Sequence, residues 1–259
     1  MLRTLPISQS EDSSLLAPKN VHASDDLRLL ALKIGIVVTL IVALDFSVAA
    51  QSQTASEFWP AVEAHVQFPQ NWRLLGFVGL RNGEDFPYQQ LNAGVGLGYQ
   101  WIPISKPHLV NIDPDKEHIF LFGGGYERIQ TFQSGTTSYE NRMTLQALAA
   151  FRPASPLYLS DRNRVEFRWI NGTYSTRYRN QLYGSYDFAI HKLRFSPYAS
   201  AEVFYNGAVG SWNEEQYSGG IEWPYKQLLM LQTFYLRQNC TTCNPVHLNV
   251  GGVTLNVFF

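Results

Sequence analysis

The feature that most constrains this chain is a two-residue alternation of apolar and polar side chains, which recurs from residue 57 to the C-terminus. In residues 90–101, one face carries Leu91, Ala93, Val95, Leu97, Tyr99 and Trp101. The other face is glutamine, asparagine and glycine. Because successive side chains of a β-strand point to opposite faces, this period predicts strands rather than helices.

The alternation predicts eleven strands, at residues 57–68, 72–82, 89–101, 117–131, 139–152, 162–171, 176–188, 196–206, 213–223, 228–238 and 245–259. A strand needs about 9–11 residues to cross a bilayer at a tilt, whereas strands of globular sheets average five or six. Bacterial single-chain barrels have an even number of strands. We therefore predict an all-β fold, a transmembrane antiparallel up-and-down β-barrel of twelve strands, with ten as the alternative.

The composition agrees with a barrel and argues against other classes. Aromatic residues make up 14% of the chain, and barrels in bilayers place such rings at the membrane–water boundaries. A mean hydropathy of −0.16 is too polar for a bundle of membrane helices. A net charge of −1, with no run of Lys or Arg, gives no indication of nucleic acid as a partner.

An apolar segment near the N-terminus, Ile34 to Leu44, follows Arg28 and Lys33 and precedes small residues that end at Ala50. A basic region, an apolar core and small residues predict a secretory signal peptide, cleaved near Ala50. We therefore expect residues 1–50 to be a leader and signal peptide and residues 51–259 to be the barrel. The first 28 residues exceed an ordinary n-region, so an over-long translation start, a disordered leader and an uncleaved anchor stay open.

The chain ends in an amphipathic segment whose lipid-facing residues are predicted to be Val253, Leu255, Val257 and Phe259. Such a strand with a terminal aromatic resembles the signal read by the outer-membrane assembly machinery. We expect that machinery, periplasmic chaperones and outer-membrane lipids as partners, and the outer membrane of a Gram-negative bacterium as the location. Gly251-Gly252 predicts a bulge that shifts the register and returns to the outer face Val246, Leu248 and Val250.

Three short motifs resemble a known family: Arg177-Tyr-Arg-Asn180, Pro197-Tyr-Ala-Ser-Ala-Glu-Val-Phe-Tyr205 and Leu236-Arg-Gln238. Their order and spacing match the family catalogued as domain of unknown function 2490, over residues 57–259. The resemblance implies an outer-membrane barrel. It implies no activity, because the family has none assigned.

The predicted inner face carries a charged cluster that consists of Glu63, His65, Arg142, Arg164, Glu166, Arg168, Arg177, Arg179 and Glu202, with Asp187 and Glu222 on the same face. Ion pairs of this kind can fill and hold a narrow barrel, or they can line a path for anions. We favour the structural interpretation. The protein is thus expected to be non-enzymatic, either structural or a narrow passive channel, without a metal or cofactor.

Two other functions stay open. Glu63 and His65 share one face two residues apart, as a base and its orienting acid could, although the chain has no Gly-x-Ser-x-Gly motif. A lipid-modifying enzyme at the barrel rim is therefore one alternative. A soluble periplasmic lipid-binding barrel is the other.

Two local motifs have structural interpretations. In an exported protein, Cys240-Thr-Thr-Cys243 favours a small disulfide loop, with free thiols or a metal or redox pair as alternatives. Asn171-Gly172 predicts a tight hairpin turn between two strands.

Overall fold

The computed structural model describes residues 54–83, 88–101, 116, 119–154, 156–190, 193–225 and 228–259. The predicted leader and signal peptide, with its cleavage near Ala50, lie outside these residues. The described chain is nearly all β-strand, with one short 3-10 helix, η1 (Pro69–Asn71). No helix in it is long and apolar enough to cross a bilayer.

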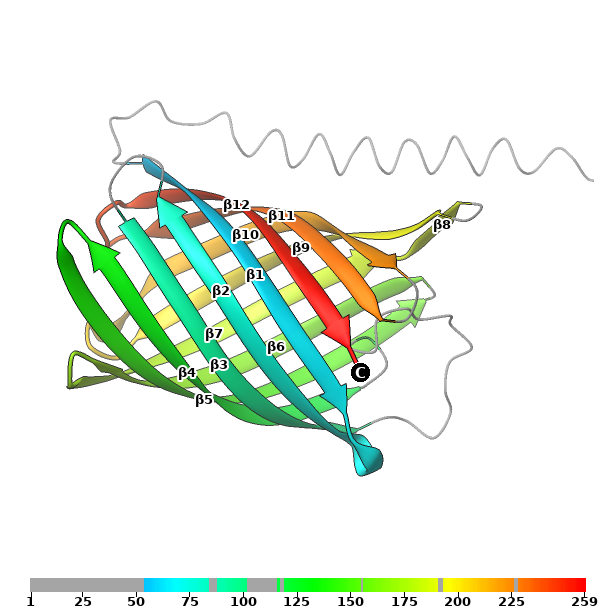
Figure 1. The fold of residues 1–259 in the computed structure, drawn as a ribbon. Helices are drawn as coiled ribbons and strands as arrows, with labels where there is room; N and C mark the ends of the chain where they lie inside the picture. The colour runs from blue at the N-terminus through cyan, green and yellow to red at the C-terminus, as the bar shows by residue number, and fades with distance from the viewer. Residues whose placement is uncertain are drawn as a thin grey trace, which may run out of the picture. The chain divides into compact units, whose positions relative to one another are not determined.

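Eleven strands close into a barrel, drawn in Figure 1, and a twelfth extends from its wall. The wall strands are β1 (Thr54–Gln67), β2 (Trp72–Gly83), β3 (Tyr88–Trp101), β4 (Phe120–Gln133), β5 (Thr136–Ala154), β6 (Leu157–Ile170), β7 (Thr173–Tyr186), β9 (Leu193–Asn206), β10 (Ser211–Tyr225), β11 (Leu229–Cys240) and β12 (His247–Phe258). The short strand β8 (Phe188–Ile190) pairs with the start of β9. The predicted all-β barrel is confirmed.

The closure of the wall differs from the prediction in one respect. Twelve strands are defined in the described chain, but an odd number of them forms the wall. Because an up-and-down chain reverses at each turn, the first and the eleventh wall strands run in the same direction. β1 and β12 accordingly pair in parallel, from Thr54–His247 to His65–Phe258, and every other wall pair is antiparallel.

This parallel seam places Thr54 and Phe259 at opposite ends of the barrel (Figure 1). We call the end with Thr54 and the loop 241–246 the disulfide end. The end with Phe259 and η1 is the C-terminal end.

Two hairpins at the disulfide end close with two-residue turns. At Asn171-Gly172, the predicted turn, the φ angles are 47° and 87°, and Ile170 pairs with Thr173. Residues 134–135, between β4 and β5, have φ angles of 50° and 79°. Positive φ at both central residues is the geometry that matches the twist of paired strands.

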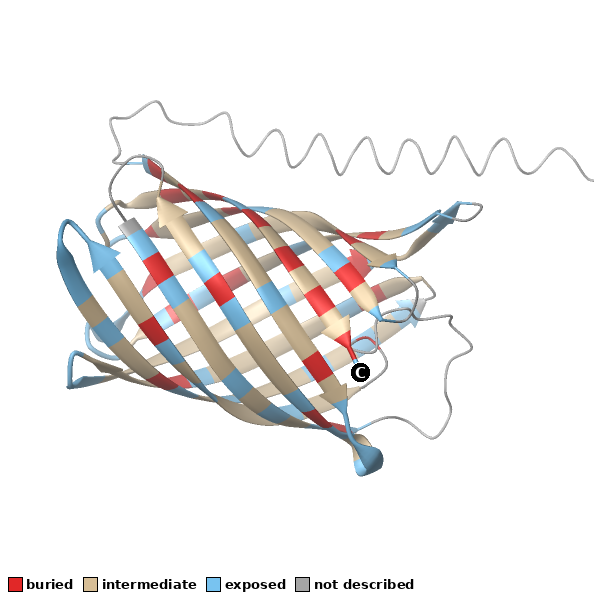
Figure 2. Ribbon diagram, viewed as in Figure 1, coloured by how far each residue is buried: buried red, intermediate tan, exposed pale blue. Residues whose placement is uncertain are grey.

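The two faces of the wall have opposite polarity. Outward apolar side chains that are half or more exposed occur around the barrel, among them Val62, Val78, Val95, Phe122, Met143, Leu145 and Leu182. Many inward charged side chains are buried, including Glu166 at 0% and Glu202 at 4% exposure. Figure 2 shows buried and exposed residues interspersed along the strands, with intermediate residues between them. This is the reverse of the arrangement in a soluble globule.

The outer apolar surface has a polar interruption on β6 and β7. Asp161 Oδ1 accepts a hydrogen bond of 2.6 Å from Asn180 Nδ2, and the hydroxyl of Tyr178 donates one of 2.5 Å to Asn163 Oδ1. These groups therefore satisfy one another, which lowers the cost of their outward position.

The last strand keeps one register throughout. Val253, Leu255, Val257 and Phe259 point outward, as predicted, and between them Thr254, Asn256 and Phe258 are buried inside. The predicted bulge at Gly251-Gly252 is wrong, because the pairing of β12 with β1 and β11 runs through both glycines without a shift.

Contacts on both the inner and the outer face of β12 explain why its register is unbroken. Leu248 and Val250 point inward and join an apolar cluster with Ala55 and Leu236, against which Trp59 and Phe234 pack. On the outer face, Asn249 Oδ1 accepts hydrogen bonds from Arg237 (2.6 Å) and Tyr235 (2.9 Å). Polar groups near the disulfide end thus have partners outside, and no bulge is needed to turn them inward.

Gly252 makes room for an aromatic ring in this cluster. A Cβ at this position would overlap the ring of Phe234, whereas a Cβ at Gly251 would come no closer than 4.0 Å to Phe58. We expect Gly252→Ala to lower the free energy of unfolding by about 1–3 kcal/mol, because the ring must shift. Gly251→Ala is the matched control and should stay near wild type in urea unfolding of the folded barrel. Equal stability of the two variants would contradict the assigned register.

Candidate functional site: the charged lumen

An ion-pair network occupies the inner face of β4, β5, β6, β7, β9 and β10. It brings together six residues of the predicted cluster, Arg142, Glu166, Arg168, Arg177, Arg179 and Glu202. It also contains four residues that were not singled out from the sequence, Glu127, Glu140, Arg162 and Glu214. Each of the four occupies an inward-facing position of its strand, where polar residues alternate with outward-facing ones. The two-residue alternation is therefore the sequence signal that could have identified them.

Glu166 lies at the centre of the network and is fully buried. Its carboxylate accepts hydrogen bonds from Arg177 Nε at 2.8 Å and Arg179 Nη1 at 3.0 Å. Arg142 Nε approaches it to 3.7 Å from the neighbouring strand β5. A carboxylate at this depth is stable only because guanidinium groups replace its lost hydration.

The network extends from Glu166 toward both ends. Arg179 holds Glu202 with two hydrogen bonds, of 3.0 and 2.7 Å, and Arg162 adds a third of 3.2 Å. Toward the disulfide end, Arg168 grips Glu140 with bonds of 2.7 and 2.8 Å. These bidentate contacts fix the orientation of each guanidinium plane as well as the position of its charge.

Phe204 supports the guanidinium groups of this network from β9. Its ring is 1% exposed and lies 5.2 Å from Arg177 Cζ and 4.5 Å from Arg179 Cζ. A cation over a ring face gains further stabilisation where water is excluded.

Arg164 differs from the other arginines of the cluster. Its Nη2 donates a hydrogen bond of 3.0 Å to Gln146 Oε1, and among the described residues no carboxylate forms an ion pair with it. Its Nε atom is buried without a partner, as is that of Arg162.

Glu63 and His65 lie apart from the network, on β1. His65 Nδ1 accepts a hydrogen bond from Arg73, so Nε2 carries the proton, which it donates to Asn256 Oδ1 at 3.1 Å. Glu63 Oε2 lies 3.6 Å from the same nitrogen, and the ring stacks on Phe258 at 4.8 Å. Within the described chain, none of these partners of His65 carries a hydroxyl or thiol nucleophile.

The interior contains a cavity of about 610 Å³ that is lined by residues from both walls, among them Glu63, Arg162, Arg164, Gln181 and Ser200. At its C-terminal end, Lys116 enters from the connection between β3 and β4. Its Nζ lies 2.7 Å from Glu222 and 3.4 Å from Asp187, and Arg152 Nη2 donates to its carbonyl at 2.5 Å. Asp187 and Glu222, predicted on the inner face, thus hold Lys116 across this mouth.

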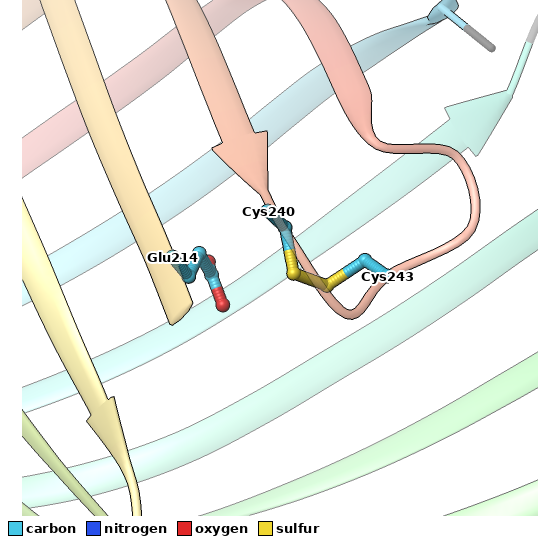
Figure 3. A group of neighbouring side chains, drawn as sticks. All are labelled: Glu214, Cys240 and Cys243. Carbon is cyan, nitrogen blue, oxygen red and sulfur yellow. A yellow bond between two sulfur atoms is a disulfide. The ribbon is translucent and has the colours of Figure 1, made fainter. Parts of the chain in front are cut away.

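The two cysteines form a disulfide in the structure, just beyond β11 (Figure 3). Glu214 of β10 lies beside them, within 4.8 Å of the sulfur atoms. Both sulfurs are engaged with each other, so they offer no thiolate to a metal.

A family model described as "Protein of unknown function (DUF2490)" matches residues 56–247. The chain belongs to this family. No curated protein matches the chain at a significant level. A solved structure described as "NanC porin structure in rhombohedral crystal form" is similar over 68% of this chain and 78% of that one, at 11% identity and a TM-score of 0.36. A TM-score this low supports no argument about function.

The three motifs that resemble the DUF2490 family lie on strands β7, β9 and β11 of the barrel. The motif at residues 177–180, on β7, supplies Arg177 and Arg179 to the network, and the motif at residues 197–205, on β9, supplies Glu202. In the third motif, on β11, Leu236 belongs to the apolar cluster. Two of the three motifs therefore build the charged lumen of this family member.

Proposed function

We propose that this chain is a non-enzymatic outer-membrane β-barrel that provides a narrow, charged passage for small solutes. The observation that carries the proposal is the reversed polarity of the wall. Apolar side chains such as Val95 and Leu145 are more than half exposed outside, while carboxylates and guanidinium groups are buried inside. Hydrocarbon is the solvent that suits such an outer surface.

The aromatic residues support the same proposal by their heights along the barrel. Exposed rings near the disulfide end include Phe132, Tyr139, Tyr174 and Trp212. Exposed rings near the C-terminal end include Trp72, Trp101, Phe151, Tyr186 and Tyr225. Between them lie exposed aliphatic residues such as Val95, Leu145 and Leu182, together with Tyr126, Tyr217 and the mutually hydrogen-bonded polar groups of β6 and β7. Two aromatic girdles around an apolar band are the pattern of barrels that span a bilayer.

The passage is inferred from the lumen. A cavity of about 610 Å³, lined by charged, polar and apolar side chains, can hold a small hydrated solute, and the ion-pair network lies beside it on the inner face of the wall. Side chains fill small barrels to this degree, so any conductance is expected to be far below that of a wide porin.

Reconstitution into a planar bilayer tests the passage. We expect small, discrete conductance steps, and we expect Lys116→Ala to enlarge them, because Lys116 and Glu222 meet at 2.7 Å at the C-terminal mouth. A bilayer that stays silent after insertion of correctly folded wild type and variant would overturn the channel and favour a purely structural role.

The non-enzymatic part of the proposal has its own test. Deleting the gene should leave the phospholipid and lipopolysaccharide composition of the outer membrane unchanged. A change that wild type restores and His65→Ala does not would instead support the lipid-modifying alternative.

A further inference from the structure

One arginine of the lumen, Arg164, has no ion-pair contact with a carboxylate of the described residues. Glu166 and Glu202 are shared among four guanidinium groups, those of Arg142, Arg162, Arg177 and Arg179. Arg164 is left with the neutral amide of Gln146 as its hydrogen-bond partner.

Arg162 is only partly neutralised. Its contact of 3.2 Å is to Glu202 Oε1, the oxygen that already accepts a hydrogen bond of 3.0 Å from Arg179 Nε. Arg162 and Arg164 are two residues apart on β6, so both side chains point to the same inner face, and both line the cavity. Within the described chain, the one ion-pair contact of these two guanidinium groups is to Glu202, which Arg179 shares, and such a pair favours an anion from outside the chain.

From this geometry we propose that Arg162 and Arg164 form a lumen site for the carboxylate of a small hydroxylated organic acid. The inference rests on the proposed passage and assigns its solute class. A guanidinium fork matches the two oxygens of a carboxylate, which a single point charge does not. The cavity wall also contains hydroxyl and amide groups that suit a polyhydroxy solute, those of Ser160, Gln181, Ser200 and Ser218, beside apolar side chains such as Leu75 and Leu148.

Glu63 sets the strength of this site from the opposite wall. Its carboxylate lies 3.6 Å from Nε2 of the neutral His65 and acts electrostatically on both Arg162 and Arg164. An anion held by the two arginines is therefore repelled by Glu63. Substitutions of Arg164 and of Glu63 should therefore change the affinity for such an anion in opposite directions.

Ligand-detected NMR titration of the folded barrel in detergent tests the proposal, with sodium gluconate as the probe and glucose as its neutral counterpart. We expect gluconate to bind at least tenfold more tightly than glucose. Arg164→Gln should weaken gluconate binding about tenfold or more, since a charge-assisted pair is lost, and Glu63→Gln should strengthen it. A general loss of structure would weaken binding in both variants and is checked by their heat-dependent gel mobility.

Three results would overturn the site: no binding of gluconate by wild type, equal binding by Arg164→Gln, or displacement of gluconate by an equal concentration of chloride. The titration does not depend on transport. Conductance without gluconate binding would contradict the proposed site and still support the proposed passage. Gluconate binding by a protein that gives no conductance would contradict the passage and still support the site.

Discussion

Replacing Glu166 with Gln is expected to lower the free energy of unfolding by about 3–5 kcal/mol, the largest single effect in the lumen. Glu166 is fully buried, and its two oxygens are bound by Arg177 and Arg179 at 2.8 and 3.0 Å. The amide keeps the shape of the carboxylate and removes its charge. The guanidinium groups around it then stay buried with too few counter-ions.

Glu214→Gln is the matched control for this effect. Glu214 belongs to the same network and undergoes the same chemical change, but its contact with Arg177 is long, 3.8 Å. We expect a loss within about 1 kcal/mol, typical of weak or exposed pairs. Both variants are compared by urea unfolding in one detergent. Equal losses in the two variants would contradict the central place of Glu166 in the network.

Replacing Leu145 with Arg is expected to cost about 2–4 kcal/mol and to reduce the yield of inserted barrel. Leu145 lies on the outer face in the middle of β5, and it is 58% exposed. In a bilayer this position meets hydrocarbon, where a guanidinium loses its hydration.

Phe132→Arg provides the comparison at another depth. Phe132 is also exposed, at 41%, but it lies one residue before the end of β4. Near the boundary an arginine reaches the headgroups, so the expected cost is about 0–1 kcal/mol. In a soluble barrel both exposed residues would face water, and both substitutions would be nearly neutral. Unfolding from lipid vesicles measures the difference.

The barrel and the identity of its two faces could be predicted from the sequence, because a period of two places side chains without knowledge of the partners. The apolar pattern predicts that β5 starts at residue 139, whereas the strand begins at Thr136. Strands extend further than the apolar pattern indicates where a two-residue turn, such as residues 134–135, leaves the pairing complete to its tip.

The parallel seam and the partner choice within the lumen could not be predicted in this way. The seam depends on how many strands join the wall, and β8, with three residues, does not complete it. The two-residue period also predicts which side chains face the lumen, but it does not predict which of them contact one another. The period therefore groups Arg164 with Glu166, whereas the hydrogen-bond partner of Arg164 is Gln146. The bulge expected at Gly251-Gly252 is wrong for a related reason, since Gly252 makes room for the ring of Phe234 and does not change the register.

The central claim is that the apolar outer face of a closed barrel lies in the outer membrane. Its most direct test is the gel mobility of the full chain, boiled and unboiled, taken from outer-membrane fractions washed with alkaline carbonate. We predict that the protein stays with the washed outer membrane and that the unboiled form migrates faster, as a compact barrel. Release into the soluble fraction, or identical mobility of both samples, would contradict the claim.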